Sequence, residues 1–217
     1  MKLLLAVFSC HRYNYKDPQG LIEDWFTRPN VDRVSALRDT WLKDVTVDYK
    51  IFRGLGNGTT IPLPDEVFLN APDGYFQSSQ KLKALAQYAL NNGYDYLLKV
   101  DDDVFVYWDR LDLQPTADYI GGGPNTGFAS GFTYWLSAEA MRFLIASPCS
   151  RWQEDVWVGC VMENNHVPLT KDARYFCAPT TRTNQYISDE GLVNPNNFLT
   201  IHSLSPEQMR TYYAKGH

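Results

Sequence analysis

Three consecutive carboxylates, Asp101, Asp102 and Asp103, stand between apolar runs at residues 97–100 and 104–106. The Val, Leu and Phe residues on both sides are typical of a strand that is covered on both faces. Burying three unpaired carboxylates beside such runs would be very costly, so we expect the triplet at an open strand end. Hard divalent cations prefer carboxylate oxygens and water as ligands. The triplet therefore indicates a candidate cation site, and a solvated acidic turn is the simpler alternative.

A second acidic pair, Glu154 and Asp155, is predicted to begin a helix. The positive end of a helix dipole favours carboxylates, so a plain helix cap is one interpretation. Trp152 and Trp157 flank the pair, and apolar neighbours raise the pKa of a carboxyl group whereas the helix terminus lowers it. An ionised carboxylate beside an aromatic wall could accept the proton of a sugar hydroxyl. Trp108, Trp152 or Trp157 could stack on a sugar ring, with core packing as the alternative for each.

Three further side chains could join such a site. His202 ends a predicted strand at residues 198–202, and a neutral imidazole there could complete a metal site opened by Asp103. Arg38 and Lys81, on two predicted helices, could supply the positive charge that a diphosphate needs beside a metal. The alternatives are a structural histidine and two solvated helix cations, and spacing alone favours the solvated cations.

Strands and helices alternate over the first half of the chain. We predict a first strand that ends at residues 9–11, a helix at 31–43 and a strand at 46–52. A helix capped by Ser78 or Ser79 and ending at residues 92–93 is predicted next, followed by the strand before the triplet. This order predicts parallel α/β winding, in which ligands bind beyond the carboxyl ends of the strands. The ends of the first strand and of the triplet strand should therefore lie on one rim.

The second half of the chain is less regular. We predict a short strand at residues 119–123, a strand or hairpin at 127–136, a helix capped by Ser137, and a last helix capped by Ser205. The glycine-rich turn at residues 53–58 lacks the Lys and the helix start of a phosphate loop, which favours a plain loop.

Composition narrows the classes of partner. A net charge of −5 argues against a protein that grips a nucleic-acid backbone. The apolar run at residues 3–8 is too short for a signal peptide, and no run is long enough to span a bilayer. The four cysteines lack metal-ligand spacing, which favours reduced, buried thiols.

Six segments in order resemble glycosyltransferase family 31, which includes β-1,3-galactosyltransferases, N-acetylglucosaminyltransferases and Fringe. They are a first strand at residues 4–9, an Arg-x-Thr-Trp helix at 35–41, an Asp-x-Tyr segment leading to a Lys at 73–81, a Lys-x-Asp-Asp-Asp core at 98–106, a Ser-Gly-x-x-Tyr-x-x-Ser segment at 130–137, and a Glu-Asp-Val-x-x-Gly motif at 154–159. The likeness runs from about residue 3 to residue 213.

The resemblance implies a single GT-A, Rossmann-like α/β domain with a central, mostly parallel sheet flanked by helices. Residues 1–110 would be the nucleotide-sugar-binding half and residues 111–217 the acceptor and catalytic half. The resemblance implies a metal-dependent inverting glycosyltransferase that moves a hexose from a nucleotide sugar, expected to be a UDP-sugar, to an acceptor hydroxyl of a glycan. The expected cation is Mn²⁺, with Mg²⁺ as the alternative.

The resemblance also assigns roles to residues. Asp155 would be the catalytic base. The metal ligands would be Asp101, Asp103 and His202. The donor would be contacted by Ser9, Cys10, His11, Arg38, Lys81, Asp101 and Asp102.

Two other functions remain open. Acid-rich strand ends also serve metal-dependent phosphotransferases and nucleases, and the aromatic content would suit a non-catalytic carbohydrate-binding module. Because no export signal or membrane span is evident, we expect a soluble, cytoplasmic protein of microbial or viral type. A Golgi-lumenal ectodomain without its anchor is the alternative.

Overall fold

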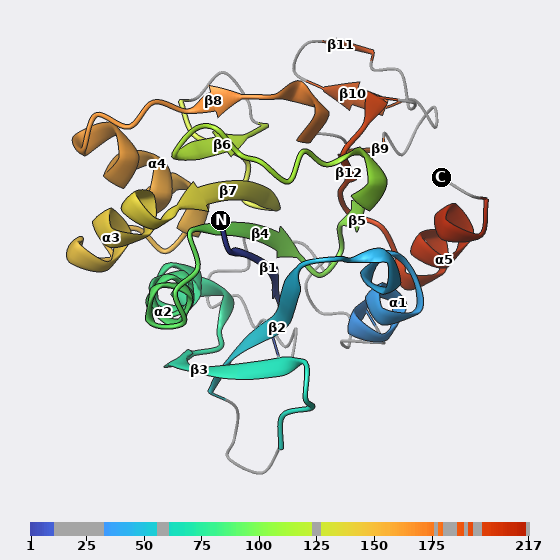
Figure 1. The fold of residues 1–217 in the computed structure, drawn as a ribbon, viewed down its shortest axis with the longest axis horizontal. Coiled ribbons are helices and arrows are strands. Elements are labelled where there is room, and N and C mark those ends of the chain that lie inside the picture. Colours follow the sequence, from blue (N-terminus) through green and yellow to red (C-terminus); the bar gives the residue numbers. More distant parts are fainter. Residues whose placement is uncertain are drawn as a thin grey trace, which may run out of the picture.

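A computed structural model describes residues 1–10, 33–55, 61–122, 127–175, 178–179, 186–188, 191–192 and 197–215, and every structural statement below concerns these residues. Figure 1 shows a twisted central sheet with helices on both sides.

The central sheet has seven strands in the order β3-β2-β1-β4-β7-β6-β8. These are β3 (Glu66–Pro72), β2 (Asp48–Leu55), β1 (Leu3–Phe8), β4 (Tyr96–Asp101), β7 (Thr133–Ser137), β6 (Tyr119–Gly121) and β8 (Thr170–Lys171). The first four strands in that order are parallel, β7 runs antiparallel to both of its neighbours, and β8 is parallel to β6. The predicted α/β class, a single domain with a mostly parallel sheet, is confirmed.

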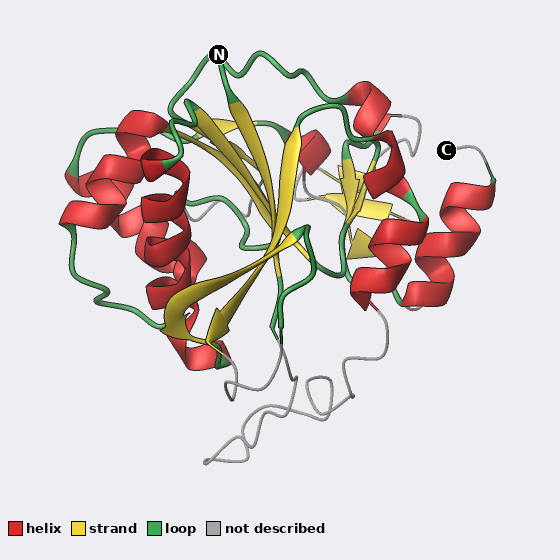
Figure 2. Cartoon of the chain, turned by 60° about the horizontal axis from the view of Figure 1, so that its bottom comes forward, coloured by secondary structure: helices red, strands yellow, loops and turns green. Residues whose placement is uncertain are grey.

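Residue alternation along β1 explains the layers. Leu3, Leu5 and Val7 face one hydrophobic core, whereas Leu4, Ala6 and Phe8 face the other. The second core is covered by α2 (Ser78–Asn91), α3 (Ala138–Ala146) and α4 (Glu154–Asn164). The first is covered by α1 (Arg33–Asp39), the 3₁₀ turn η2 (Trp41–Asp44) and α5 (Pro206–Ala214). Figure 2 shows these two groups of helices on opposite sides of the sheet.

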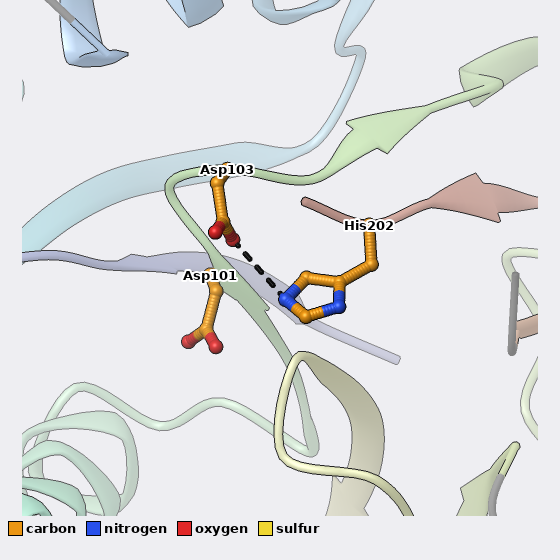
Figure 3. A group of neighbouring side chains, drawn as sticks. All are labelled: Asp101, Asp103 and His202. Carbon is orange, nitrogen blue, oxygen red and sulfur yellow. Dashed lines mark ion pairs between the residues drawn. The ribbon is translucent and has the colours of Figure 1, made fainter. Parts of the chain in front are cut away.

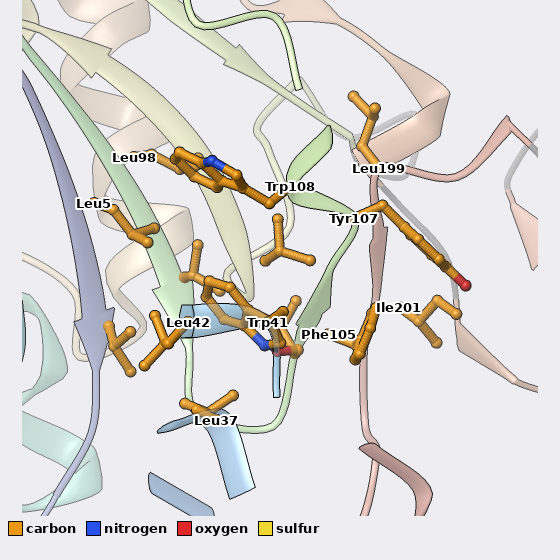
Figure 4. Packing of buried hydrophobic residues seen from close by; sticks show 14 of the residues in the cluster. Leu5, Leu37, Trp41, Leu42, Leu98, Phe105, Tyr107, Trp108, Leu199 and Ile201 are labelled. Atoms are coloured by element: carbon orange, nitrogen blue, oxygen red, sulfur yellow. Dashed lines mark hydrogen bonds between the residues drawn. The ribbon is translucent and has the colours of Figure 1, made fainter. Parts of the chain in front are cut away.

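A small two-stranded sheet ties the end of the chain to its centre. β12 (Thr200–Ile201) pairs antiparallel with β5 (Phe105–Val106), and Ile201 lies opposite Phe105. Both side chains are buried in the first core, beside Trp41 and Trp108 (Figure 4). The indole Nε1 of Trp41 donates to the carbonyl oxygen of Val104 at 3.1 Å. This packing fixes the segment that follows the Asp triplet.

The remaining elements are short. They are the 3₁₀ turns η3 (Tyr75–Gln77), η4 (Trp108–Arg110) and η5 (Ala173–Tyr175), and a sheet of β9 (Ala178–Pro179), β10 (Tyr186–Ser188) and β11 (Gly191–Leu192).

Several predicted boundaries need correction. The α-helix expected at residues 31–43 ends at Asp39, because Thr40 leaves helical geometry and its hydroxyl donates to the Ala36 carbonyl oxygen at 2.6 Å. Strand β3 was not predicted. Ser78 and Ser79 do not cap α2, whose N-cap is Gln77, although its end before Gly93 is confirmed.

The two helix caps predicted for the second half of the chain are confirmed, whereas the predicted strands at 119–123 and 127–136 are shorter, at Tyr119–Gly121 and Thr133–Ser137. The Ser137 hydroxyl accepts from the Ala140 N–H, and Ser205 forms a capping box with Gln208. Cys149 and Cys160 are free thiols as expected, and Cys10, Cys149 and Cys160 are half-buried rather than buried. The fourth cysteine and the glycine-rich turn beyond Leu55 lie outside the described residues.

Candidate functional site

The ends of β1 and β4 meet on one rim of the sheet. The two strands are adjacent and parallel, and Phe8 lies opposite Asp101. One residue further on, the Ser9 hydroxyl donates to Asp102 Oδ2 at 2.7 Å, and both side chains are buried. The rim expected from the strand order is therefore present. It arises because parallel neighbours end at the same edge.

Asp101, Asp103 and His202 form the candidate metal group. Each offers one ligand atom, and these three atoms all lie within 4.8 Å of one another. The His202 Nε2 atom is 3.5 Å from Asp103 Oδ1, and Figure 3 shows the imidazole reaching from the end of β12 toward the two carboxylates. Two carboxylates and one imidazole suit Mn²⁺ or Mg²⁺ better than a soft cation.

A ring contact positions the imidazole of His202, and a backbone hydrogen bond positions the segment that carries it. Its ring stacks on Phe132, with centroids 4.4 Å apart and planes 11° apart. The backbone N–H of Leu204 donates to the Asp103 carbonyl oxygen at 3.0 Å, which joins the two ligand segments directly. Burial lowers the pKa of His202 below its usual value, although Asp103 opposes the shift. A neutral imidazole is the form that binds a metal.

Lys99 links the triplet to the second acidic pair. Its Nζ atom is 2.5 Å from Asp101 Oδ1 and 3.0 Å from Glu154 Oε1, and it also donates to the Gly131 carbonyl oxygen. The lysine side chain is completely buried. Burial raises the pKa of Asp101, and the charge of Lys99 opposes that rise. The lysine therefore brings the start of α4 beside the end of β4.

Arg33, the first residue of α1, pairs with two members of the triplet. Its Nη1 atom is 3.2 Å from Asp102 Oδ1 and 3.4 Å from Asp103 Oδ2. We use the name acidic cluster for Asp101, Asp102, Asp103, Glu154 and Asp155. Lys99 pairs with Asp101 and Glu154, Arg33 with Asp102 and Asp103, and His202 lies beside Asp103. Several carboxylates gathered at an open strand end favour binding of a cation.

Asp155 lies in the first turn of α4, close to Gly131. Its Oδ1 atom accepts from the Val156 N–H at 2.8 Å. A Cβ atom at position 131 would lie 3.2 Å from Asp155 Oδ2 and 2.9 Å from Glu154 Oε1, so a side chain there would crowd both carboxylates. Burial, and then the neighbouring charge of Glu154, raise the pKa of Asp155 above its usual value. A carboxylate of raised pKa is a stronger base while it remains ionised.

Two of the predicted donor-binding cations have other partners. Arg38 donates to Asp65 Oδ2 at 2.8 Å and to Glu66 Oε1 at 3.0 Å, so the structure does not bring it to the acidic cluster. Lys81 is buried and donates to the Ser9 carbonyl oxygen at 2.7 Å. Lys81 therefore holds the end of β1 in position. Its Nζ atom also lies 4.4 Å from the ring centroid of Phe8.

The last two predicted donor residues follow β1. Cys10 is half-buried just beyond Ser9, and His11 lies outside the described residues.

The sequence interpretation missed three participants: Arg33, Lys99 as a bridge, and Gly131. A signal existed for Lys99, because it is a charged residue in a run that reads as fully buried strand. A buried lysine requires carboxylate partners, which would have pointed to the acidic pair. No local signal marks Arg33, which reaches the triplet only through the tertiary fold.

No protein-family model matches the sequence, and neither does any curated protein. Solved structures resemble the fold at low identity. A protein described as a nucleotide-diphospho-sugar transferase from Desulfovibrio desulfuricans G20 aligns with a TM-score of 0.48 and 13% identity, over 79% of this chain and 80% of that one. A glycosyltransferase involved in glycosylation of the major capsid of PBCV-1 aligns with a TM-score of 0.49 and 10% identity, over 99% and 100%.

A third structure is the catalytic domain of Drosophila β1,4-galactosyltransferase 7 in complex with xylobiose. It aligns with a TM-score of 0.45 and 15% identity, over 78% of this chain and 64% of that one. At these identities the functional assignment has to rest on the site itself. In the described part of the chain, no helix combines the length and the apolar character that a membrane crossing needs.

Proposed function

We propose that this protein is a metal-dependent, inverting glycosyltransferase of the family 31 type. It would move a hexose from a UDP-sugar to a hydroxyl group of a glycan. The observation that supports this proposal most is the bridge made by Lys99, which places the candidate metal group beside the helix start that carries Asp155. A site for charge stabilisation and a candidate base thus occupy one rim of the sheet.

Asp101, Asp103 and His202 would hold the divalent cation. When bound, the cation would supply positive charge for the diphosphate of the leaving group. Arg33 lies against Asp102 and Asp103 and would add a guanidinium on the same side, a group that suits phosphate oxygens. Ser9 and Lys81 would keep the end of β1 in position along the nucleoside.

Asp155 would act as the base. Its carboxylate removes the proton from an acceptor hydroxyl, and the hydroxyl oxygen forms a bond to the anomeric carbon of the donor. The bond from that carbon to the diphosphate breaks, and its electron pair leaves with the nucleoside diphosphate. Attack from the opposite face inverts the configuration at the anomeric carbon. Burial and the charge of Glu154 raise the pKa of Asp155, which makes its carboxylate a stronger base.

A donor screen tests the proposal. The protein is incubated with Mn²⁺ and UDP-glucose, UDP-galactose or UDP-N-acetylglucosamine, each with methyl β-glycosides as acceptors, and release of UDP is measured. We expect release with at least one donor, complete loss in excess EDTA, and recovery when Mn²⁺ is restored. Asp103→Asn should lose this activity, whereas Asp65→Asn, in the ion pairs around Arg38, should retain it.

Product analysis separates the rival enzyme class. Mass spectrometry of the products should show an enlarged glycoside together with UDP. Cleavage within the diphosphate, or release of UDP that EDTA does not affect, would contradict the proposal.

A further inference from the structure

Three aromatic rings gather at the surface where α2 and α4 begin. We call them the aromatic platform: Tyr75, Phe76 and Trp152. The Trp152 ring centroid is 5.3 Å from that of Tyr75 and 5.0 Å from that of Phe76. Trp152 is 37% exposed and Tyr75 is 45% exposed, which is unusual for such large apolar side chains.

The other two tryptophans considered for sugar stacking belong to the core. Trp157 is completely buried and donates its indole N–H to the Pro148 carbonyl oxygen at 2.8 Å. Trp108 is also buried, in the core on the other side of the sheet (Figure 4). Of these three candidates, Trp152 is therefore the one whose ring can meet a ligand.

The platform is anchored by buried polar groups. The Ser78 hydroxyl donates to the Trp152 carbonyl oxygen at 2.6 Å, and the Ser79 hydroxyl donates to that of Arg151 at 2.5 Å. Both serines are buried at the start of α2. These bonds fix the residue 151–152 backbone against η3, which carries Tyr75 and Phe76. A preorganised surface loses little conformational entropy when a ligand binds.

The platform adjoins the proposed base. Trp152 precedes Asp155 by three residues, a separation that an extended chain spans in about 10 Å. Tyr75 lies within the electrostatic field of the acidic cluster: burial raises its pKa, and the charges of Glu154, Asp101 and Asp155 add to the shift. The exposed rings therefore lie close to the start of α4, which carries the partly buried Glu154 and Asp155.

This combination suits a pyranose ring. One face of a pyranose presents C–H groups that pack on an aromatic ring, while its hydroxyls donate to nearby carboxylates. A nucleotide base could also stack on the rings, but its phosphates would then lie beside the carboxylates of Glu154 and Asp155, which repel them. The negative charge around the platform therefore favours a neutral sugar.

We infer that the aromatic platform binds the acceptor: a pyranose ring of a glycan stacks on Trp152 and Tyr75 and directs one hydroxyl toward Asp155. This inference rests on the proposed function and adds the side of the site from which the acceptor enters. Trp152 would be a specificity-determining residue, because the ring that it contacts selects which hydroxyl reaches the base.

Kinetics of Trp152→Ala and Trp152→Phe test the inference. With methyl β-glycosides as acceptors, we expect Trp152→Ala to lower the acceptor kcat/KM at least about tenfold, mainly through KM, because the stacking surface is lost. Trp152→Phe should recover most of that loss. Hydrolysis of the UDP-sugar without an acceptor, and the rise in Tm caused by UDP with Mn²⁺, should stay as in the unchanged protein.

Tyr213→Ala is the matched control. Tyr213 is a partly exposed aromatic residue on α5, where its hydroxyl donates to Asp44, and it packs on the first core, on the face of the sheet opposite α2 and α4. This variant should leave acceptor kinetics unchanged. An unchanged acceptor KM in Trp152→Ala, or a smaller UDP and Mn²⁺ shift in that variant, would overturn the inference, the second by assigning the rings to the donor.

Direct binding keeps the two proposals distinguishable. In saturation-transfer difference NMR, the same methyl glycosides should give ligand signals in the presence of the unchanged protein. These signals should disappear when Trp152→Ala replaces it. If UDP release is never observed but these signals behave as expected, the platform is retained and the transferase proposal fails. If release occurs and the signals survive the substitution, the platform is wrong and the transferase proposal stands.

Discussion

The fold contains two groups of charged residues, which differ in their number of carboxylates and in the burial of their cations. At the start of β3, Arg38 and Arg53 pair with Asp65 and Glu66; we call these four residues the arginine cluster. Its charges cancel, and Arg38 makes a two-point contact with Asp65, at 2.8 Å through both Nε and Nη2. The acidic cluster instead gathers five carboxylates around the completely buried Lys99, with Arg33 and His202 beside the Asp triplet.

The difference separates a structural role from a binding role. The two arginines and two carboxylates of the arginine cluster satisfy one another, so this cluster needs no ligand. In the acidic cluster the central cation is completely buried, and the carboxylates at the open end of β4 favour binding of a further cation. Arg38, a predicted donor contact, uses its guanidinium within the arginine cluster, where it donates to Asp65 and Glu66. The difference also predicts that matched substitutions in the two clusters will have different consequences.

The largest expected effect is on turnover in Asp155→Asn. Loss of a positioned base should lower sugar transfer by about 10²- to 10⁴-fold. The rise in Tm with UDP and Mn²⁺ should persist, because the candidate metal group is unchanged. Asp65→Asn, which also neutralises one carboxylate, should keep full activity. Equal loss of transfer and of ligand-induced stabilisation in Asp155→Asn would show that Asp155 is structural, and the contrast between the clusters would disappear.

A large effect on stability is expected in Lys99→Met. Removing this buried cation leaves Asp101 and Glu154 without their shared partner, and breaking such a buried pair costs about 3–5 kcal/mol of unfolding free energy. Arg38→Met leaves Glu66 with Arg53, and because Arg38 is partly exposed we expect a smaller loss, about 1 kcal/mol. Urea unfolding followed by circular dichroism measures both values. Similar losses in the two variants would mean that burial does not distinguish the clusters.

The smallest expected effect has the opposite sign in the two clusters. The pKa of Asp155 is raised in the folded protein, so ionisation of Asp155 costs stability as pH rises through that pKa. Asp155→Asn removes the cost and should raise Tm at pH 7 by about 1–3 °C.

The gain should vanish near pH 3, below the ordinary carboxyl pKa of about 3.9, where the aspartate is already protonated. Asp65→Asn should instead lower Tm at pH 7, because it weakens the two-point contact with Arg38. A lower Tm for Asp155→Asn at pH 7 would show that its carboxylate is favourably paired.

Features set by local sequence were predictable. The run before Asp101 is apolar on both faces, so its strand, its burial and its open end follow from residue types alone. The rule that parallel strands end at one edge then brings Ser9 to Asp102. Ser137 and Ser205 cap their helices because their side chains act within a single turn.

Features set by tertiary packing were not predictable. β3 lies at the edge of the sheet, where its buried and exposed residues do not follow strict alternation. Ser78 and Ser79 resemble helix caps, but the carbonyl oxygens of residues 151 and 152 take their hydroxyls. Spacing could not distinguish Trp152 from Trp157 either, because exposure depends on which elements cover each ring. Arg33 reaches the triplet from a different layer of the fold.

The pairing of β12 with β5 has a consequence for how the protein matures. The candidate cation ligands Asp101 and Asp103 come from the middle of the chain, and the third ligand, His202, is synthesised roughly a hundred residues later. At a synthesis rate of about 5–20 residues per second, the two aspartates wait roughly 5–20 seconds for the imidazole. A nascent chain would therefore fold much of its sheet before the three-ligand set exists, and capture of the ion would be among the last events of assembly.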